Sequence, residues 1–545
     1  MKARAGKKRS HEPYSSYGEA PVQNAQHKVD DGARPLRVLF IDNIANNAYL
    51  NAKALRRHGV EVDVYVGGYY HIMACPEWEE GGFTNFAGTH NQPDWTRTVG
   101  LNYVRPDWVI QMREPFGLRY LLAKTEGRRW AARFWWKVGN LDREIDCSDG
   151  GVGKRLRSGL VGGYKLVRKG AAAARKLYRL GRLCLRVGYR LITEGRLRSG
   201  RKSTIPAAVD ALPIAIEPMP SVPIDPDMPN ALRDIEATAP AYRESVRTLM
   251  SRYDIVQVYG AGGRLPLIAG TPFLAFEHGT LRSLPFESSY MGQLTYLTYT
   301  RARHAFITNA DVLGSAQRLE LPSYSFIPHP VNEDSLHETP ESQALRASLC
   351  RELDTDFIVF HPSRQHWEPE VRSPNWEKGN DIFIRGFARF VKDVNPRASA
   401  VMVDWGLSVP ASRALLEELG VADRVRWIPP VPNALMCRYI AATDLLADQF
   451  WLGSFGSTAP KAWGCGKPAM FYLNEDQHRW CFPELPPVLN VRSPEDVFES
   501  LRRLHQDPVY MRAVSQDSKR WYQAYHSNEL ITQKLLDVYR GQAQT

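Results

Sequence analysis

The chain has 545 residues, which is too long for one ordinary core and predicts two or three domains. A hydrophobic content of 43% with 24% charged residues is typical of globular proteins and excludes a largely disordered or fibrous chain. The formal net charge is +11, and 16 Lys and Arg residues lie between Gly151 and Lys202 against one acid, Glu194. This one segment therefore makes the chain basic.

Cysteine spacing and hydropathy indicate the compartment. The seven cysteines are scattered and lack CxxC spacing, which argues against a disulfide framework and against a zinc site. The basic, polar N-terminal segment has no apolar h-region, and no run of about 18 apolar residues occurs. We therefore expect a cytoplasmic protein without a transmembrane span.

The first half begins with a strand–helix–strand pattern. Residues 1–35 are expected to form a disordered tail, and "LRVLFIDN" (36–43), "AYLNAKALRRHG" and "VEVDVYVGG" follow as strand, helix and strand. The pattern breaks up between about 70 and 235. It resumes with "YDIVQVYGAGG" (253–263), "PFLAFEHGT" (272–280), "HAFITNA" (304–310) and "SYSFIPHP" (323–330). Residues 36–330 are therefore predicted to form one α/β domain with a parallel sheet.

A second alternating series begins at "DFIVFHPSR" (356–364). Helical and strand patterns alternate from there through "KGNDIFIRGFARFVKDV", "ASAVMVDWG", "ASRALLEELG", "RVRWIPPVP", "DLLADQF" and "KPAMFYL". Residues 331–510 are predicted to form a second doubly wound domain, followed by a C-terminal helix over 511–545. Ligands of such sheets bind beyond the carboxyl ends of the strands.

The segment 120–230 is predicted to be a basic insertion with a Pro-rich linker. Apolar or small residues recur at steps of three and four from 167 to 191, which indicates one helical face. The arginines on another face are Arg168, Arg175, Arg179, Arg182, Arg186 and Arg190. With Trp130, Trp135 and Trp136 nearby, the pattern favours a helix lying on an anionic membrane surface. A solvated charged face and a nucleic-acid surface are the alternatives, the latter ranked last.

Two cations in the second half point to phosphate chemistry. Arg364 ends a predicted strand, and Lys378 stands just before a predicted helix. Two cations beside free backbone N–H groups form a suitable pyrophosphate site. Taken singly, either cation could equally be a surface charge.

The stretch "GSFGSTAPKAWGCGKP" follows the same logic one crossover later. Gly453 and Gly456 allow close approach of the backbone to a ligand, and Ser457 is an N-cap residue type. A plain strand–turn–helix is the structural alternative. The stretch is not a P-loop, because Lys467 is followed by Pro468.

Polar residues also end strands of the first half. "EHGTLR" places Glu277, His278 and Arg282 after a strand, on the edge where ligands bind. Asn43, Asn46 and Asn47 follow the first strand, and their amides suit the recognition of hydroxyl groups.

These patterns together resemble a GT-B glycosyltransferase of the family 4 (glycosyl transferases group 1) type. The second half carries the resemblance through "SR…EKGNDIFIRGFARF", "DRVRWIPPV", "ATDLLADQF" and "GSFG…AWGCGKPAM". The first half adds "LRVLFID", "YDIVQVYG", "EHGT", "ITNAD" and "IPHPVNED". The resemblance covers roughly residues 36–70 and 240–510, and the insertion stays unmatched.

The resemblance implies two Rossmann-like domains facing a cleft, with a nucleotide-sugar donor on the second and an acceptor on the first. Arg364 and Lys378 would then neutralise the diphosphate without a metal, and His278 would approach the transferred sugar. Gly456 and Ser457 would offer backbone amides to phosphate, with Ser363 also on the donor side. Such enzymes usually retain the anomeric configuration.

The chain departs from the family pattern at two positions. Members typically carry two glutamates eight residues apart, where this chain has Gly453 and Lys461. Asp448 is the nearest carboxylate and could serve the donor from the strand end.

Three functions are compatible with the sequence. The preferred one is a glycosyltransferase at the cytosolic face of a membrane that uses a nucleotide sugar and a lipid-linked or membrane-proximal glycan. The second is a catalytically inactive binding or scaffold protein of the same fold, and the third is a sugar phosphorylase.

Overall fold

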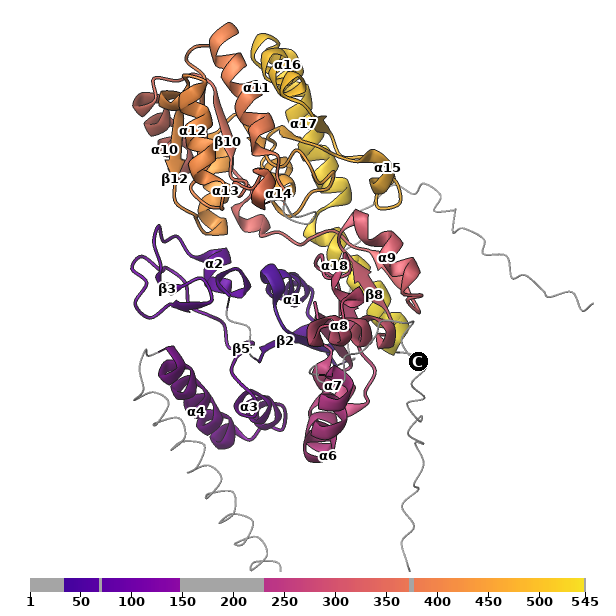
Figure 1. Cartoon of the computed structure of the whole chain (residues 1–545). Coiled ribbons are helices and arrows are strands. Elements are labelled where there is room, and N and C mark those ends of the chain that lie inside the picture. The colour runs from indigo at the N-terminus through magenta and orange to yellow at the C-terminus, as the bar shows by residue number, and fades with distance from the viewer. Residues whose placement is uncertain (1–33, 68–70, 148–229, 372–376, 544–545) are drawn as a thin grey trace, which may run out of the picture. The chain divides into compact units, whose positions relative to one another are not determined.

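The computed structural model describes residues 34–67, 71–147, 230–371 and 377–543, and Figure 1 labels their elements. Residues 36–543 contain two parallel sheets. The predicted tail and most of the predicted insertion, including its arginine face, lie outside the described residues. Within the described ranges, no helix combines the length and apolarity that crossing a membrane requires.

The first sheet has seven parallel strands in the order β5-β2-β1-β6-β7-β8-β9. Their bounds are β1 Arg37–Ile41, β2 Glu61–Val66, β5 Val109–Gln111, β6 Ile255–Tyr259, β7 Leu274–Phe276, β8 Ala305–Ile307 and β9 Tyr324–Phe326. The central strand β1 pairs with β2 on one side and β6 on the other, and its apolar run is buried. A continuous apolar run is expected for a strand covered on both faces.

The helices between these strands include α1 (Asn47–Arg57), α2 (Pro76–Glu80), α3 (Phe116–Thr125), α4 (Arg129–Cys147), α6 (Ala231–Met250), α7 (Arg264–Ala269), α8 (Tyr290–Arg301) and α9 (Leu313–Arg318). A two-stranded hairpin, β3 (Ala87–Thr89) and β4 (Gln92–Asp94), lies between α2 and β5. The broken pattern between 70 and 235 therefore hides an edge strand, β5, which sequence reasoning missed.

The second sheet has six parallel strands in the order β12-β11-β10-β13-β14-β15. Their bounds are β10 Ile358–His361, β11 Ser399–Val403, β12 Val425–Ile428, β13 Leu445–Ala447, β14 Ala469–Phe471 and β15 Val488–Asn490. Its helices are α10 (Pro340–Glu352), α11 (Asn380–Asp393), α12 (Val409–Glu418), α13 (Asn433–Ala442), α14 (Thr458–Gly464), α15 (Glu475–His478) and α16 (Pro494–Gln506). The predicted pair of doubly wound α/β halves is confirmed.

Helix α11 shows how the sequence covers the second sheet. Phe383, Phe387 and Phe390 recur at helical spacing and are fully buried. Gly386 lies where α11 meets α16, because a Cβ there would come within 2.5 Å of the Pro494 carbonyl oxygen. Helix α16 begins at a capping box formed by Ser493 and Asp496. Close packing of the two helices therefore depends on one glycine.

The chain returns to the first sheet after completing the second. Helix α17 (Pro508–Tyr525) contributes Trp521 to the second core, whereas α18 (Asn528–Ala543) packs on α1 and β6. In Figure 1 the yellow α18 accordingly belongs with elements coloured indigo and magenta. Ile531 and Leu535 are buried in the core under β1, and Tyr539 Oη donates to Gln257 Oε1 at 2.7 Å.

Candidate functional site

Arg364 and Lys378 follow β10 at the carboxyl edge of the second sheet, and the charge of Arg364 affects the pKa of Lys378. Burial, together with the charges of Arg364 and Arg282, lowers the pKa of Lys378 to about 8, against the opposite effect of Asp448. Burial also lowers the pKa of Arg364, whose guanidinium lies over the Trp405 ring at 5.4 Å. Bringing like charges together under partial burial is unfavourable unless an anion joins them.

Backbone and side-chain bonds hold Lys378 in this position. Its N–H donates to the carbonyl of His366 at 2.8 Å, and Asn380 Oδ1 accepts from the N–H of His366 at 2.9 Å. Asn380 Nδ2 donates to His361 Nε2, and His361 Nδ1 donates to the carbonyl of Ala447, both at 2.9 Å. This network joins the ends of β10 and β13 to the start of α11. The cation is therefore placed by the sheet itself.

The end of β13 adds a carboxylate beside the cations. Ser363 Oγ donates to Asp448 Oδ1 at 2.9 Å, so these two predicted residues come together. Burial raises the pKa of Asp448, and the charges of Lys378 and Lys461 lower it. Gln449 accepts a hydrogen bond from Lys378 Nζ and donates another to the carbonyl of Ser454.

The glycine stretch forms a turn followed by a short helix. Gly453 has φ +67°, and a Cβ there would lie 2.9 Å from the Tyr472 ring, so both conformation and space require glycine. Gly456 has open space where a Cβ would be. Ser457 is the N-cap of α14, and its Oγ accepts from Lys461 Nζ at 3.1 Å. Lys461 is only 2% exposed, so the lysine lies inside the protein rather than on its surface.

His278 lies at the carboxyl edge of the first sheet with a defined tautomer. Asn47 Nδ2 can only donate, so its 2.7 Å contact makes His278 Nδ1 the acceptor and leaves the proton on Nε2. Burial lowers the pKa of His278 to about 4, and the Arg282 charge acts in the same direction. A neutral imidazole with a fixed Nε2–H is therefore held at this edge.

The other predicted acceptor-side residues bond within the chain. Asn43 Nδ2 donates to the Ala74 carbonyl at 2.7 Å, and Asn46 Nδ2 donates to the Cys75 carbonyl at 2.9 Å. These two amides hold the loop before α2, so their donors are already used inside the protein.

Glu277 and Arg282 also have partners inside the first domain. Glu277 Oε2 accepts from Thr308 and Asn309, at 3.0 Å from each side chain. Arg282 contacts Asp311 through Nε and Nη2, at 2.6 and 3.0 Å. The structure thus gives Asn47 alone among the predicted asparagines a direct contact with His278.

Sequence reasoning missed Glu79, which lies on α2. Asn433 Nδ2, at the start of α13, donates to Glu79 Oε2 at 2.6 Å. Burial raises the pKa of Glu79, and Lys461 is the strongest opposing charge. The signal available was the acidic run in "CPEWEEGG", but its other two glutamates have conventional partners: Glu77 pairs with Arg105 and Glu80 with Lys53.

Comparison with solved structures decides the fold. HepE from Anabaena, solved with UDP and glucose, aligns with a TM-score of 0.50 at 13% identity, over 93% of this chain and 100% of that one. The chain has the GT-B fold. The resemblance recognised in the sequence is thereby confirmed at the level of fold.

Sequence comparison finds shorter matches. The D-inositol 3-phosphate glycosyltransferase of Mycobacterium sp. (strain KMS) is 34% identical over 94 residues, 17% of this chain and 21% of that protein. The same-named protein of Mycobacterium avium is 28% identical over 148 residues, 27% and 32% of the two chains. The match therefore spans about a fifth to a third of these relatives' length. No family model matches the chain.

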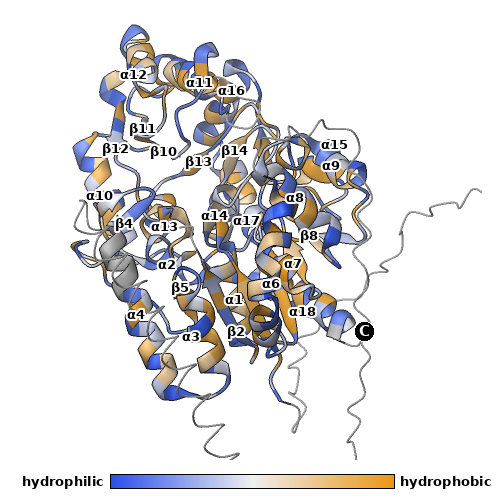
Figure 2. Cartoon of the chain, turned by 60° about the horizontal axis from the view of Figure 1, so that its bottom comes forward, coloured by the Kyte–Doolittle hydropathy of each residue, from blue (hydrophilic) through white to orange (hydrophobic). Residues whose placement is uncertain are grey.

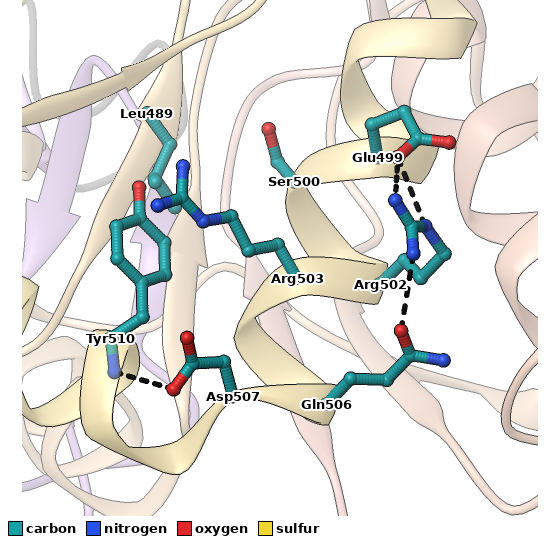
Figure 3. A pocket seen from close by; sticks show the side chains of 8 residues that line it. All are labelled: Leu489, Glu499, Ser500, Arg502, Arg503, Gln506, Asp507 and Tyr510. Carbon is teal, nitrogen blue, oxygen red and sulfur yellow. Dashed lines mark hydrogen bonds and ion pairs between the residues drawn. The ribbon is translucent and has the colours of Figure 1, made fainter.

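This GT-B chain also has a surface hollow remote from the site, lined by Leu489, Glu499, Ser500, Arg502, Arg503, Gln506, Asp507 and Tyr510 (Figure 3). Arg502 bonds to Glu499, and Arg503 lies over the Tyr510 ring at 3.6 Å. Because α16 runs back from the end of β15, its C-terminal turn lies near the amino edge of the second sheet. The hollow therefore lies at the amino edge of the second sheet, opposite the carboxyl edge that carries Arg364 and Lys378.

The predicted membrane residues fall into two groups. Trp135 and Trp136 pack on Phe116 and Tyr120 of α3, with ring centroids 6.4 and 5.1 Å apart. Trp130, by contrast, is 84% exposed. Figure 2 shows both apolar and hydrophilic stretches on α4. The six arginines from Arg168 to Arg190 lie outside the described residues.

Proposed function

We propose that this protein is a glycosyltransferase that takes a sugar from a nucleotide-sugar donor. The observation that carries the proposal is that Arg364 and Lys378 both follow β10 at the carboxyl edge of the second sheet, where the charge of Arg364 acts on Lys378. A departing nucleoside diphosphate places negative charge at the point where such cations are needed. UDP-bound HepE has the same fold, and the short curated matches carry glycosyltransferase names, which supports this choice of ligand.

His278 and Asn47 would act on the sugar from the first domain. The Nε2–H of a neutral imidazole can donate a hydrogen bond to a sugar hydroxyl or ring oxygen without adding a charge. Asn47 keeps this tautomer, because its amide donates to Nδ1. We propose that transfer retains the anomeric configuration and needs no metal, since the two cations supply the charge.

The acceptor is proposed to be a lipid-linked or membrane-proximal glycan at the cytosolic face of a membrane. Helix α4 supports this, because Trp130 and Phe134 are 84% and 52% exposed, and Arg133 and Lys137 are exposed beside them. An amphipathic face with aromatic and basic residues suits an anionic lipid surface. Each basic residue near such a leaflet contributes about 1 kcal/mol.

Calorimetry tests whether the protein binds a nucleoside diphosphate, as the enzyme proposal requires. Wild-type protein is titrated with UDP, GDP and ADP, and we expect one to bind. We expect Arg364→Ala to weaken that binding about 100-fold through loss of charge-assisted hydrogen bonds. Arg413→Ala is the matched control, because Arg413 pairs with Asp404 and lies over Trp427. Failure to bind any of the three nucleotides would refute the proposal.

An inactive binding protein is the second candidate, favoured by the buried Lys461, which stands where the family pattern has a glutamate. Release of free sugar from a panel of nucleotide sugars, with and without lipid extract, separates the two. Binding without turnover on any donor would select the inactive protein.

Vesicle flotation tests the membrane part. We expect wild-type protein to float with vesicles containing phosphatidylserine, and the Trp130→Ser, Phe134→Ser double variant to float less. Flotation that is equal on neutral and anionic vesicles would contradict the proposal.

A further inference from the structure

Glu79 has a buried carboxylate oxygen that nothing in the described chain satisfies. The residue is 1% exposed, and its Oε2 accepts from Asn433 Nδ2. Its Oε1 is also buried and has no hydrogen-bond partner among the described residues. A buried acceptor without a donor is unfavourable, so folding alone does not account for a glutamate at this position.

The strongest compensating charge on Glu79 comes from Lys461, which forms no direct ion pair with it in the described part of the chain. Lys461 opposes the effect of burial on Glu79, yet no ion pair within 4.0 Å joins the two among the described contacts. Lys461 Nζ donates to Ser457 Oγ at 3.1 Å, which leaves further N–H donors on an ammonium that carries three. An acceptor and a donor therefore lie near each other without bonding directly.

Glu79 and Lys461 lie toward the same carboxyl edge of the second sheet as Arg364 and Lys378. Asn433 follows β12, and Lys461 lies on α14, which follows β13, so both mark carboxyl ends of the second sheet. Lys461 also acts on Asp448, which in turn acts on Lys378. We expect a ligand whose phosphates meet Arg364 and Lys378 to extend along this same edge toward Lys461 and Glu79.

The charges near Lys461 and Glu79 indicate which chemical group of a ligand would bind between them. Asp448, Lys461 and Glu79 together have one more negative than positive charge, which disfavours phosphate. Glu79 Oε1 needs a hydrogen-bond donor, whereas Lys461 offers one. Two neighbouring hydroxyl groups satisfy both, because a hydroxyl donates and accepts.

We propose that Glu79 and Lys461 bind a vicinal diol of the nucleotide sugar, with Glu79 Oε1 accepting a hydrogen bond from one hydroxyl and Lys461 Nζ donating one to its neighbour. The inference rests on the proposed function and assigns Glu79, from the first domain, to donor recognition. The diol belongs either to the ribose or to the transferred sugar, and both have the required chemistry.

Calorimetry of Glu79→Gln tests the pairing. The probes are whichever of UDP, GDP and ADP the wild type binds most tightly, the 2′-deoxy form of that nucleotide, and whichever of its sugar conjugates the wild type binds most tightly. If the ribose is bound, the variant loses about tenfold in affinity for the ribonucleotide and nothing for the deoxy form. If the sugar is bound, the ribonucleotide binds as in wild type and only the conjugate is weakened about tenfold.

A control and a second readout separate binding from folding. Glu80→Gln changes the next residue of α2, whose carboxylate contacts Lys53 and Tyr49, and we expect its nucleotide affinity to equal that of wild type. Glu79→Gln should also unfold at the same or a higher temperature than wild type, because it removes an unsatisfied buried charge. Lys461→Gln should show the same ligand selectivity as Glu79→Gln.

Two results would overturn the inference. One is equal affinity of wild type and both variants for all three probes. The other is a uniform loss for all three with a lowered unfolding temperature, which indicates a structural role. Absence of wild-type binding to every nucleotide would instead refute the proposed function, so the two failures are distinguishable.

Discussion

The carboxyl edges of the two sheets differ in how they use their polar side chains. At the first sheet, Asn43 and Asn46 bond to loop carbonyls, and Arg282 bonds to Asp311. At the second sheet, Arg364 and Lys378 are held close together although their charges repel. At the first edge these side chains bond within the chain, whereas at the second edge the charge of Arg364 opposes that of Lys378.

This difference indicates where ligand binding draws its energy. A side chain that is already paired gains little from a ligand, because a new bond replaces an old one. Two cations kept close gain more when an anion arrives, since it relieves their repulsion as well as pairing with them. We therefore expect the second sheet to supply most of the affinity for the phosphates and the first sheet to hold His278 in place.

The largest expected effect comes from His278, the residue proposed to contact the transferred sugar directly. His278→Ala should lower the rate of transfer or of donor hydrolysis by about 10²- to 10³-fold, the range for losing one hydrogen-bond donor aimed at the reacting group. Nucleoside diphosphate affinity should stay unchanged. The exposed histidine His58, which pairs with Glu529, provides the control His58→Ala. An equal loss of rate and nucleotide affinity would contradict the assignment of nucleotide binding to the second sheet and sugar contact to the first.

The next effect is a pH dependence that belongs to the second edge. The pKa of Lys378 is lowered to about 8, so its ammonium is charged below that pH and neutral above it. Once the terminal phosphate of the ligand is fully ionised above about pH 7, nucleoside diphosphate affinity should change little up to pH 7.5 and fall about tenfold between pH 8 and 9.5. Calorimetry across this range measures the fall.

Lys378→Arg is the matched control, because a guanidinium stays charged throughout. It should bind with less pH dependence above pH 8. A decline with the same midpoint in this variant would show that another group is responsible.

A smaller effect concerns the support of His278. Asn47→Ala removes the amide that fixes Nδ1 as acceptor, so both neutral tautomers become populated. We expect a fall in rate of about three- to tenfold with unchanged nucleotide affinity. Asn47→Asp should be more harmful than Asn47→Ala, because a carboxylate favours the proton on Nδ1. The reverse order would contradict the assigned tautomer.

The smallest effect on ligand binding is expected at Arg282. Arg282→Met leaves Asp311 without its cation and should lower the free energy of unfolding by about 1–3 kcal/mol. Urea unfolding measures this loss. Nucleotide affinity should change less than twofold, since the residue is neutralised within its own domain. A large loss of affinity with unchanged stability would place Arg282 in the ligand site.

Much of the fold could be predicted from the sequence because buried parallel strands leave continuous apolar runs. "LRVLFID" and "DFIVFH" became β1 and β10 for this reason. The strand β5 was missed because it lies in the segment where the alternating pattern breaks up, whereas β7 and β8, which are equally short, continue that pattern in "PFLAFEHGT" and "HAFITNA". That Arg364 and Lys378 both lie between β10 and α11 followed from topology alone.

The finer contents of the site could not be predicted. Whether Asn43 faces a ligand or a carbonyl depends on the path of the loop at 71–75, which has no sequence pattern of its own. Glu79 meets Asn433, 354 positions later in the chain, only because α2 packs on α13. Contacts of this kind arise from tertiary packing and not from local propensity.

Helix α18 has a consequence for the order in which the protein is completed during synthesis. Ile531 and Leu535 fill the core under β1 and β6, but they emerge from the ribosome roughly 270 residues after β6. At a translation rate of about 5–20 residues per second, the apolar face of β1 and β6 that α18 covers stays exposed for roughly 15–50 s. The core of the second domain is complete once Trp521 has been translated, which is before α18. The half that is translated first is thus the half that finishes last, and it is the one that needs protection from aggregation while the ribosome is still at work.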